Sequence, residues 1–367
     1  MKNIAIILFS LVMFLPMVMQ AQGCMSGGDE GGSNVKGYIQ PQFDYHFNGD
    51  DASGNSLDEN SFKFNRARIG VVGEIPYDFS YYVFIETSAF KTGNPFLLDA
   101  FITYKRWEPY VKFSAGSFKV PFSLELNTAC HKLHTINRSR VVSELSAPDR
   151  ETGAMLFGST GDLSFLGLKN KDIIKYNFAL VNGTGLGVLD NNTSKDFVGR
   201  IVFSPVAGIS VGGSYRYGKQ PTQVADADED KRIRYSGELE VKKGNFLLQS
   251  EYIYGEDVGS YTIGGGCGGA PEIVEGSVER EGWFAQAMYM TKWNIQPVYK
   301  VEMFSQDISV DDNAQYVQTF GINYFFNDWT RLQINYMYKA EQDNYIGAGT
   351  LGEIDNDILQ VQLQVVF

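Results

Sequence analysis

Charged residues in one long segment, and at alternate positions before it, are the residues of this chain that could do chemistry. The segment 120–150 and its base carry Lys119, Glu125, Arg138, Arg140 and Arg150. The stretches before it place, at polar positions, Arg66, Arg68, Glu86, Asp99, Lys105 and Lys112. Opposite charges across a narrow, water-filled gap create a transverse field that orders solutes and selects ions. The alternative, which the sequence leaves open, is that these charges pair with one another and hold the segment against a wall.

The histidines and cysteines do not predict a catalytic or metal site. Cys130, His131 and His134 offer soft ligands, but no second cysteine pair or other close ligand accompanies them, so no metal is expected. No nucleophile elbow accompanies the histidines, so we expect no enzyme activity and no cofactor. A disulfide between Cys130 and Cys267 is one arrangement that an oxidising compartment would permit.

Composition favours an all-β protein. The 367 residues include 26 Phe, 21 Tyr and 39 Gly, with 20% charged residues, which excludes disorder and fits a helical bundle poorly. The net charge is -12, so no nucleic-acid partner is expected, because no basic surface is available to displace counterions from phosphates. Acidic clusters such as Asp50–Asp51 and Asp226–Asp230 are expected to be solvated loop tips.

The first residues are typical of an export signal. Lys2 precedes an apolar run, 4–19, that is too short to cross a bilayer, and we therefore expect a signal peptide over 1–23. Cleavage after Ala21 and cleavage before Cys24, with lipidation of Cys24, both remain open. The residues 24–34 are Gly-rich and polar, which predicts a flexible leader.

The rest of the chain alternates apolar and polar residues with a period of two. In 357–367, for example, leucine and valine alternate with Gln360, Gln362 and Gln364. Sixteen such segments have about the 9 to 11 residues that a tilted strand needs to cross a membrane. The expected strands are 35–47, 61–74, 79–90, 96–105, 110–119, 151–160, 171–182, 196–204, 208–218, 232–243, 246–255, 282–292, 295–305, 314–326, 329–340 and 357–367.

The connections mostly alternate between short turns and long loops, although 91–95 and 161–170 fit this alternation poorly. Such alternation is typical of an up-and-down barrel. A wide membrane barrel has an apolar outside and a polar inside, and this arrangement fits the strands better than a soluble sandwich does. We therefore predict a transmembrane antiparallel β-barrel of about 16 strands over 35–367. Bulges are expected at Pro41 and Pro297, because a closed barrel has no free edge for a proline.

Three stretches resemble the phosphate-selective porin O and P family: 64–75 (FNRARIGVVGEI), 115–125 (AGSFKVPFSLE) and 139–158 (SRVVSELSAPDRETGAMLFG). The motif residues are Gly116, Lys119, Pro121, Ser123 and Glu125, followed by Asp149, Arg150 and Gly153. The resemblance implies a sixteen-stranded channel, usually a homotrimer, in which the loop 120–150 folds inward and constricts the pore. The chain departs from anion-selective members in being acidic overall, which leaves phosphate in doubt as a solute.

These observations predict a porin in the outer membrane of a Gram-negative bacterium. Small hydrophilic solutes or ions would diffuse passively through a loop-constricted, charge-lined pore surrounded by outer-membrane lipid. The alternative is a plugged, non-conducting barrel that serves as a subunit of a larger outer-membrane protein assembly. The long leader motivates that alternative, since it could dock to outer-membrane protein partners.

Overall fold

The computed structural model describes residues 32–51, 53–88, 94–163, 167–168, 170–220, 230–264, 271–345 and 354–367. The expected signal peptide, Cys24 and most of the expected leader lie outside the described residues. The first strand begins at Ser33, so the last two residues of the expected leader, 33 and 34, belong to the barrel instead. Within the described ranges, no helix is long and apolar enough to span a membrane.

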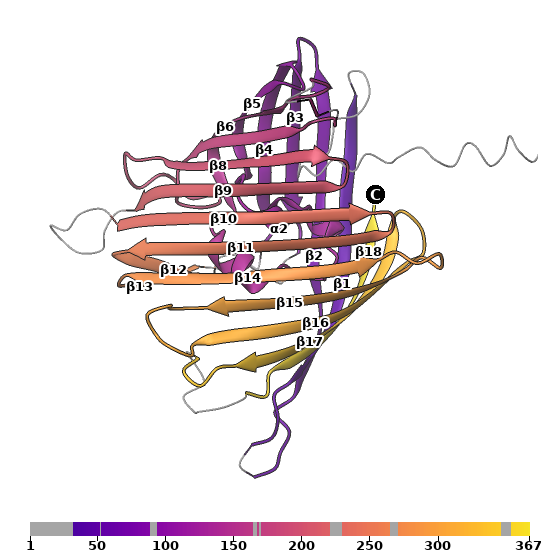
Figure 1. The fold of residues 1–367 in the computed structure, drawn as a ribbon, viewed down its shortest axis with the longest axis vertical. Helices are drawn as coiled ribbons and strands as arrows, with labels where there is room; N and C mark the ends of the chain where they lie inside the picture. The colour runs from indigo at the N-terminus through magenta and orange to yellow at the C-terminus, as the bar shows by residue number, and fades with distance from the viewer. Residues whose placement is uncertain are drawn as a thin grey trace, which may run out of the picture.

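Sixteen antiparallel strands form one closed barrel, in which the first strand pairs with the last (Figure 1). Each of the sixteen expected segments corresponds to one of these strands, so the predicted fold class is confirmed. The barrel strands are β1 (Ser33–Phe47), β2 (Glu59–Ile75), β3 (Phe79–Glu86), β4 (Phe96–Trp107), β5 (Val111–Lys119), β6 (Arg150–Ser159), β7 (Ile174–Val181), β8 (Asp196–Val206), β9 (Ile209–Gln220), β10 (Asp230–Lys243), β11 (Phe246–Val258), β14 (Val278–Tyr289), β15 (Ile295–Ser305), β16 (Ala314–Phe325), β17 (Thr330–Glu341) and β18 (Asp357–Val366).

The two faces of the wall differ as the alternation predicts. On β18, Gln362 is fully buried inside the barrel, whereas Leu363 and Val365 are exposed on the outside. The interior amides bond to one another across strands, as where the Gln362 side chain donates to Gln333 at 2.9 Å. An apolar exterior suits acyl chains, and a hydrogen-bonded polar interior suits water.

The two prolines behave differently. The pairing of β1 with β2 shifts register between Gln40 and Pro41, which confirms the expected bulge. Pro297 pairs regularly with Ile322, so the bulge expected there is wrong. The pairing of β15 with β14 begins only at Val298, and Pro297 therefore stands where one side of the strand needs no ladder bond.

One connection differs from expectation, and a second departs from the alternation of short turns and long loops as the sequence indicated. The loop expected over 256–281 is shorter, because β11 continues to Val258 and β14 begins at Val278. Between them lies a small hairpin of β12 (Ser260–Gly264) and β13 (Pro271–Glu275), which is separated from the barrel by Gly259 and Gly276. Both glycines have positive φ, 95° and 126°, which a residue with a side chain rarely adopts. The connection between β6 and β7, 160–173, is long although it lies at the end of the barrel that carries the short turns.

Residues 120–149, the inward loop, lie inside the barrel. They contain α2 (Leu124–Asn127), the short 3-10 helix η1 (Cys130–Lys132) and α3 (Arg140–Leu145), and Figure 1 shows α2 framed by the strands. The loop bonds to interior residues on distant strands, for example from the Ile136 N–H to the Asn335 side chain of β17 at 2.7 Å. The segment that the sequence placed at the constriction therefore crosses the lumen.

The cost of placing a charge at different depths on the outer face tests whether that face contacts lipid. Phe320 lies near the middle of β16 and is 52% exposed on the outside. We expect Phe320→Arg to lower the free energy of unfolding in lipid vesicles by about 2–4 kcal/mol, and Tyr324→Arg near the strand end by about 0–1 kcal/mol. Urea titrations measure both values. Equal costs for the two variants would contradict a membrane midplane at Phe320.

Candidate functional site: the inward loop and the passage beside it

The inward loop is held by a small hydrophobic core inside the lumen. The apolar side of α3 consists of Val141, Val142 and Leu145, all fully buried. It packs against interior-facing side chains of three strands, Ile253 of β11, Phe284 of β14 and Phe304 of β15. Burial of each such side chain contributes on the order of 1.5–3 kcal/mol, so the loop is docked rather than loosely tethered.

Two glycines on the same wall provide the space for α3. A Cβ at Gly282 would meet the Met303 carbonyl and lie 2.9 Å from the Val141 side chain, and one at Gly255 would lie 2.8 Å from the Arg234 side chain and 3.0 Å from the Leu145 side chain. Both glycines stand at interior positions of their strands. A larger residue at either position would therefore meet the helix as well as a neighbouring group of the wall.

Buried carboxylates fix the start of the loop. Glu251 of β11 accepts hydrogen bonds from the Ser123 hydroxyl at 2.9 Å and the Leu124 N–H at 3.1 Å. Glu125 of α2 pairs with Lys300 of β15 at 2.8 Å. Its second oxygen accepts from the N–H and the hydroxyl of Ser139 at 2.7 and 2.8 Å. Because these groups are withdrawn from water, loss of one partner would leave a buried charge uncompensated.

The middle of the loop is held mainly through its backbone. The His131 carbonyl accepts from Arg331 of β17 at 2.9 Å and from Gln364 of β18 at 3.1 Å. The His134 carbonyl accepts from Asn323 of β16 at 2.8 Å. Burial lowers the pKa of His131 to about 4 and the pKa of His134 to about 4, so both imidazoles are neutral at pH 7.

Three of the predicted site cations hold the loop in place. Arg138 donates to the carbonyls of Glu125, Leu126 and Thr128 within the loop. Arg140 donates to the side chains of Gln315 and Tyr345 and lies over the Phe304 ring at 5.2 Å. Arg66 donates to Gln40 at 3.0 Å and to the Ile136 carbonyl at 3.4 Å. The Glu125–Lys300 pair is the ion-paired bracing that the sequence left as an alternative. Arg66 and Arg140 join the loop to the wall through neutral acceptors, and Arg138 bonds to carbonyls within the loop.

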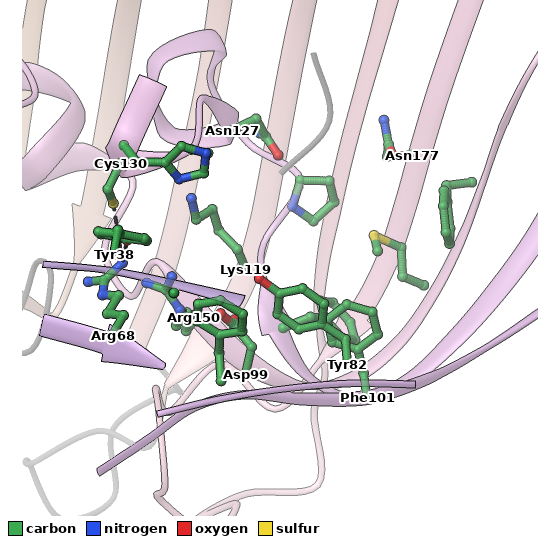
Figure 2. Close-up of a pocket in the computed structure, with 18 of the residues that line it drawn as sticks. Tyr38, Arg68, Tyr82, Asp99, Phe101, Lys119, Asn127, Cys130, Arg150 and Asn177 are labelled. Atoms are coloured by element: carbon green, nitrogen blue, oxygen red, sulfur yellow. Dashed lines mark hydrogen bonds and ion pairs between the residues drawn. The ribbon is translucent and has the colours of Figure 1, made fainter. Parts of the chain in front are cut away.

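A pocket, which we call the passage, lies between the loop and the wall formed by β1–β8. Its volume is about 80 Å³, it opens to solvent, and Figure 2 shows part of its lining. Its charged lining residues are Arg68, Lys119, Arg150, Arg200 and Asp99. Four cations and one carboxylate therefore face the same space.

The guanidinium groups in the passage are fixed by carboxylates. Arg68 pairs with Glu86 at 2.9 Å, and Glu86 also accepts from the backbone N–H of Ala67. Arg150 pairs with Asp99 at 3.0 Å and with Asp149 at 3.2 Å. Such pairs hold the donor groups at defined positions.

Lys119 differs from the arginines. Its ammonium donates to the Leu126 carbonyl at 3.0 Å and forms no ion pair within the described residues. It stands at the end of β5, where the chain turns into the lumen. Lys119 is therefore the lining cation with the least compensated charge.

The last two predicted site residues, Lys105 and Lys112, do not line the passage. Lys105 pairs with Glu74. Lys112 pairs with Glu108 at 3.1 Å and lies over the Phe157 ring at 4.9 Å. Both stand near the short-turn end of the barrel, away from the inward loop.

Sequence reasoning missed a second set of interior charges. Arg216 of β9 lies between two carboxylates, Asp196 at 2.8 Å and Glu151 at 3.1 Å. Arg280 of β14 pairs with Asp257 of β11 at 2.5 Å. These residues follow the same alternation that identified the other interior charges, so the signal for them was available in the sequence.

Within the described ranges, no three histidine, cysteine or acidic side chains are grouped so as to hold a metal ion. Cys130 is buried, and its sulfur accepts from Arg68 at 3.3 Å and from Arg138 at 3.4 Å. Cys267 lies outside the described residues, and its pairing with Cys130 stays a prediction.

Comparison with known proteins agrees with this geometry. The anion-selective porin from Comamonas acidovorans superposes with a TM-score of 0.65 at 12% identity, covering 92% of this chain and 100% of that porin. OmpF of Salmonella typhi, in complex with daunomycin, gives 0.65 at 14% identity, with 92% and 98% covered. The outer membrane channel DcaP of Acinetobacter baumannii gives 0.63 at 12% identity, with 94% and 100% covered. No curated protein sequence matches the chain.

A closed sixteen-strand barrel with an apolar exterior and a charged lumen defines an outer-membrane porin. The family model for phosphate-selective porin O and P matches residues 35–228 and 210–367, and the chain belongs to that family. It is a channel of the Gram-negative outer membrane through which small hydrophilic solutes or ions diffuse passively. The family and the fold are those of a channel rather than an enzyme.

The glycine that faces α3 gives a test of loop docking. We expect Gly282→Val to displace α3, because overpacking typically costs about 1–3 kcal/mol, and to raise single-channel conductance in planar bilayers. Gly237→Val is the matched control, since nothing lies within 4 Å of a Cβ at that position. Equal conductance for Gly282→Val and the parent channel would show that α3 does not need this space.

The buried histidines predict an acid-sensitive loop. Docking lowers the pKa of each imidazole to about 4 from its ordinary value of 6.5, so the undocked loop binds more protons between these pH values. Docking is therefore fully stable above about pH 6.5 and weakens as the pH falls toward 4. Proteolysis of the loop in the folded barrel should increase over this range. A His131→Asn, His134→Asn double variant should lose the dependence, while His46→Gln, outside the loop, should keep it. Acid-sensitive proteolysis that persists in the double variant would contradict this assignment.

Proposed function

We propose that solutes cross the barrel between the inward loop and the β1–β8 wall, and that this passage favours small anions over cations. The supporting observation is the charge of the lining, which has four cations and one carboxylate. A constriction that presents one sign of charge to a narrow, water-filled path raises the local concentration of the opposite ion.

The positions of the carboxylates support this preference. Glu86 is fully buried behind Arg68 and is not part of the lining. Arg200 likewise lines the passage while its partner Glu238 does not. A solute in the passage is therefore closer to Arg68 and Arg200 than to the carboxylates that pair with them. Lys119 donates to a carbonyl and adds a further positive charge.

The net charge of -12 is compatible with an anion preference, because a solute responds most strongly to the charged residues that lie closest to it. The acidic residues Asp50 and Asp51 follow β1, whose residue Tyr38 lines the passage. Nine residues of strand separate Tyr38 from Phe47, or about 30 Å. Charges separated through water by more than about 8 Å are largely screened at physiological ionic strength.

The remaining expectations belong to the same proposal. We propose export by the signal peptide 1–23, a leader from residue 24, and insertion among outer-membrane lipids as a homotrimer, with lipidation of Cys24 as one fate of the leader. No cofactor and no catalytic activity are part of the proposal. The plugged accessory subunit is retained as the outcome indicated if well-folded protein conducts no ions.

Reversal potentials across a KCl gradient test the preference. We expect Lys119→Gln to shift the reversal potential toward cations and to lower the anion-to-cation permeability ratio about twofold or more, since it removes the least compensated charge of the lining. Lys243→Gln removes the same charge at an exposed position near a short turn and is the control. An unchanged permeability ratio in Lys119→Gln would contradict the role proposed for this lysine.

A further inference from the structure

Apolar side chains that face the lumen are fully buried on one wall of this barrel, and some are partly exposed on the opposite wall. Ile253, Phe284 and Phe304 are covered by α3 and are buried. On the opposite wall, Tyr82 of β3 and Phe101 of β4 face the passage and remain partly exposed, while each also packs against a buried hydrophobic cluster. A wet lumen is ordinarily lined by polar groups, so partly exposed rings in a solute path call for a ligand-based explanation.

These rings form an ordered row across neighbouring strands. Tyr82 and Phe84 are stacked at 4.9 Å with an interplanar angle of 10°, and Tyr82 and Phe101 are stacked at 5.1 Å with an angle of 17°. Phe118 of β5 meets Phe101 edge-on at 6.4 Å. We call Tyr82, Phe84, Phe101 and Phe118 the aromatic row; all four line the passage.

The charges beside the aromatic row determine whether it would bind an aromatic cation or an aromatic anion. Lys119 and Arg150 line the same pocket as Tyr82 and Phe101 (Figure 2). An aromatic cation would gain from the ring faces but would meet four lining cations and a single carboxylate. An aromatic anion can place its ring on the row and its charge toward the ammonium of Lys119.

We infer that the aromatic row and Lys119 form a subsite for small aromatic carboxylates, in which the ring packs on Tyr82 and Phe101 and the carboxylate faces Lys119. The inference rests on the proposed passage and names a solute class for it. Aliphatic carboxylates of similar charge would use Lys119 alone, so the ring itself adds affinity.

Benzoate and acetate are suitable probes, because they share the carboxylate and differ in the ring. Each is titrated against the single-channel chloride current, and its binding to the detergent-solubilised barrel is followed by saturation-transfer NMR. We expect benzoate to block and bind at lower concentrations than acetate. Phe101→Leu should weaken benzoate about two- to tenfold, the value of one aromatic pair, and leave the acetate titration less affected. Phe113→Leu makes the same change on the outer face of β5 and is the control.

The outcomes separate this inference from the proposed function. Equal block and binding by benzoate and acetate in the parent protein, or a benzoate affinity that Phe101→Leu does not change, would overturn the aromatic subsite while the channel and its anion preference stand. A permeability ratio insensitive to Lys119→Gln, together with selective benzoate binding that Phe101→Leu weakens, would overturn the role proposed for Lys119 in the anion preference and support the aromatic contact.

Discussion

The closed hydrogen-bond ladder is the constraint on which the rest of this structure depends. Within a bilayer no water is available to the backbone, so each strand must pair on both sides, and the pairing of β1 with β18 removes the last two edges. Closure with sixteen strands leaves a lumen wider than side chains alone fill. The inward loop occupies much of that lumen, and the position of its docking determines where the remaining space lies.

Docking of the inward loop buries apolar side chains inside the lumen without filling the lumen. Interior-facing apolar residues on β11, β14 and β15 would be unfavourable against water, and α3 covers them. The glycines at 255 and 282 allow the helix to approach that wall closely. The loop also contacts the opposite wall, β1–β8, for example where Arg66 donates to the Ile136 carbonyl, and the passage with its aromatic row lies between the loop and that wall. The hydrophobic contact of α3 thus places the helix against one side of the lumen, and the remaining space lies on the other side.

Electrostatics in this lumen are local. The chain is acidic as a whole, yet four of the five charged residues that line the passage are cations. Ion pairs such as Arg68–Glu86 and Arg150–Asp99 fix the geometry of the lining, whereas Lys119 donates to a carbonyl and forms no ion pair within the described residues. Charges that looked equivalent by their alternation therefore divide into those that brace the loop and those that face the path.

The alternation of side chains determined the strands, their apolar outer face and the closed barrel, because a period of two is a local property of the chain. The motifs around Lys119 and Arg150 likewise indicated the family and the loop. Only the tertiary structure decided the role of each charge. Glu125 and Lys300 are 175 residues apart, and they pair because the docked loop brings α2 to β15. Whether a lumen-facing ring such as Phe304 is buried or, like Phe101, remains in the passage depends on which wall the loop covers. That choice is made by contacts distant in sequence, which no local pattern records.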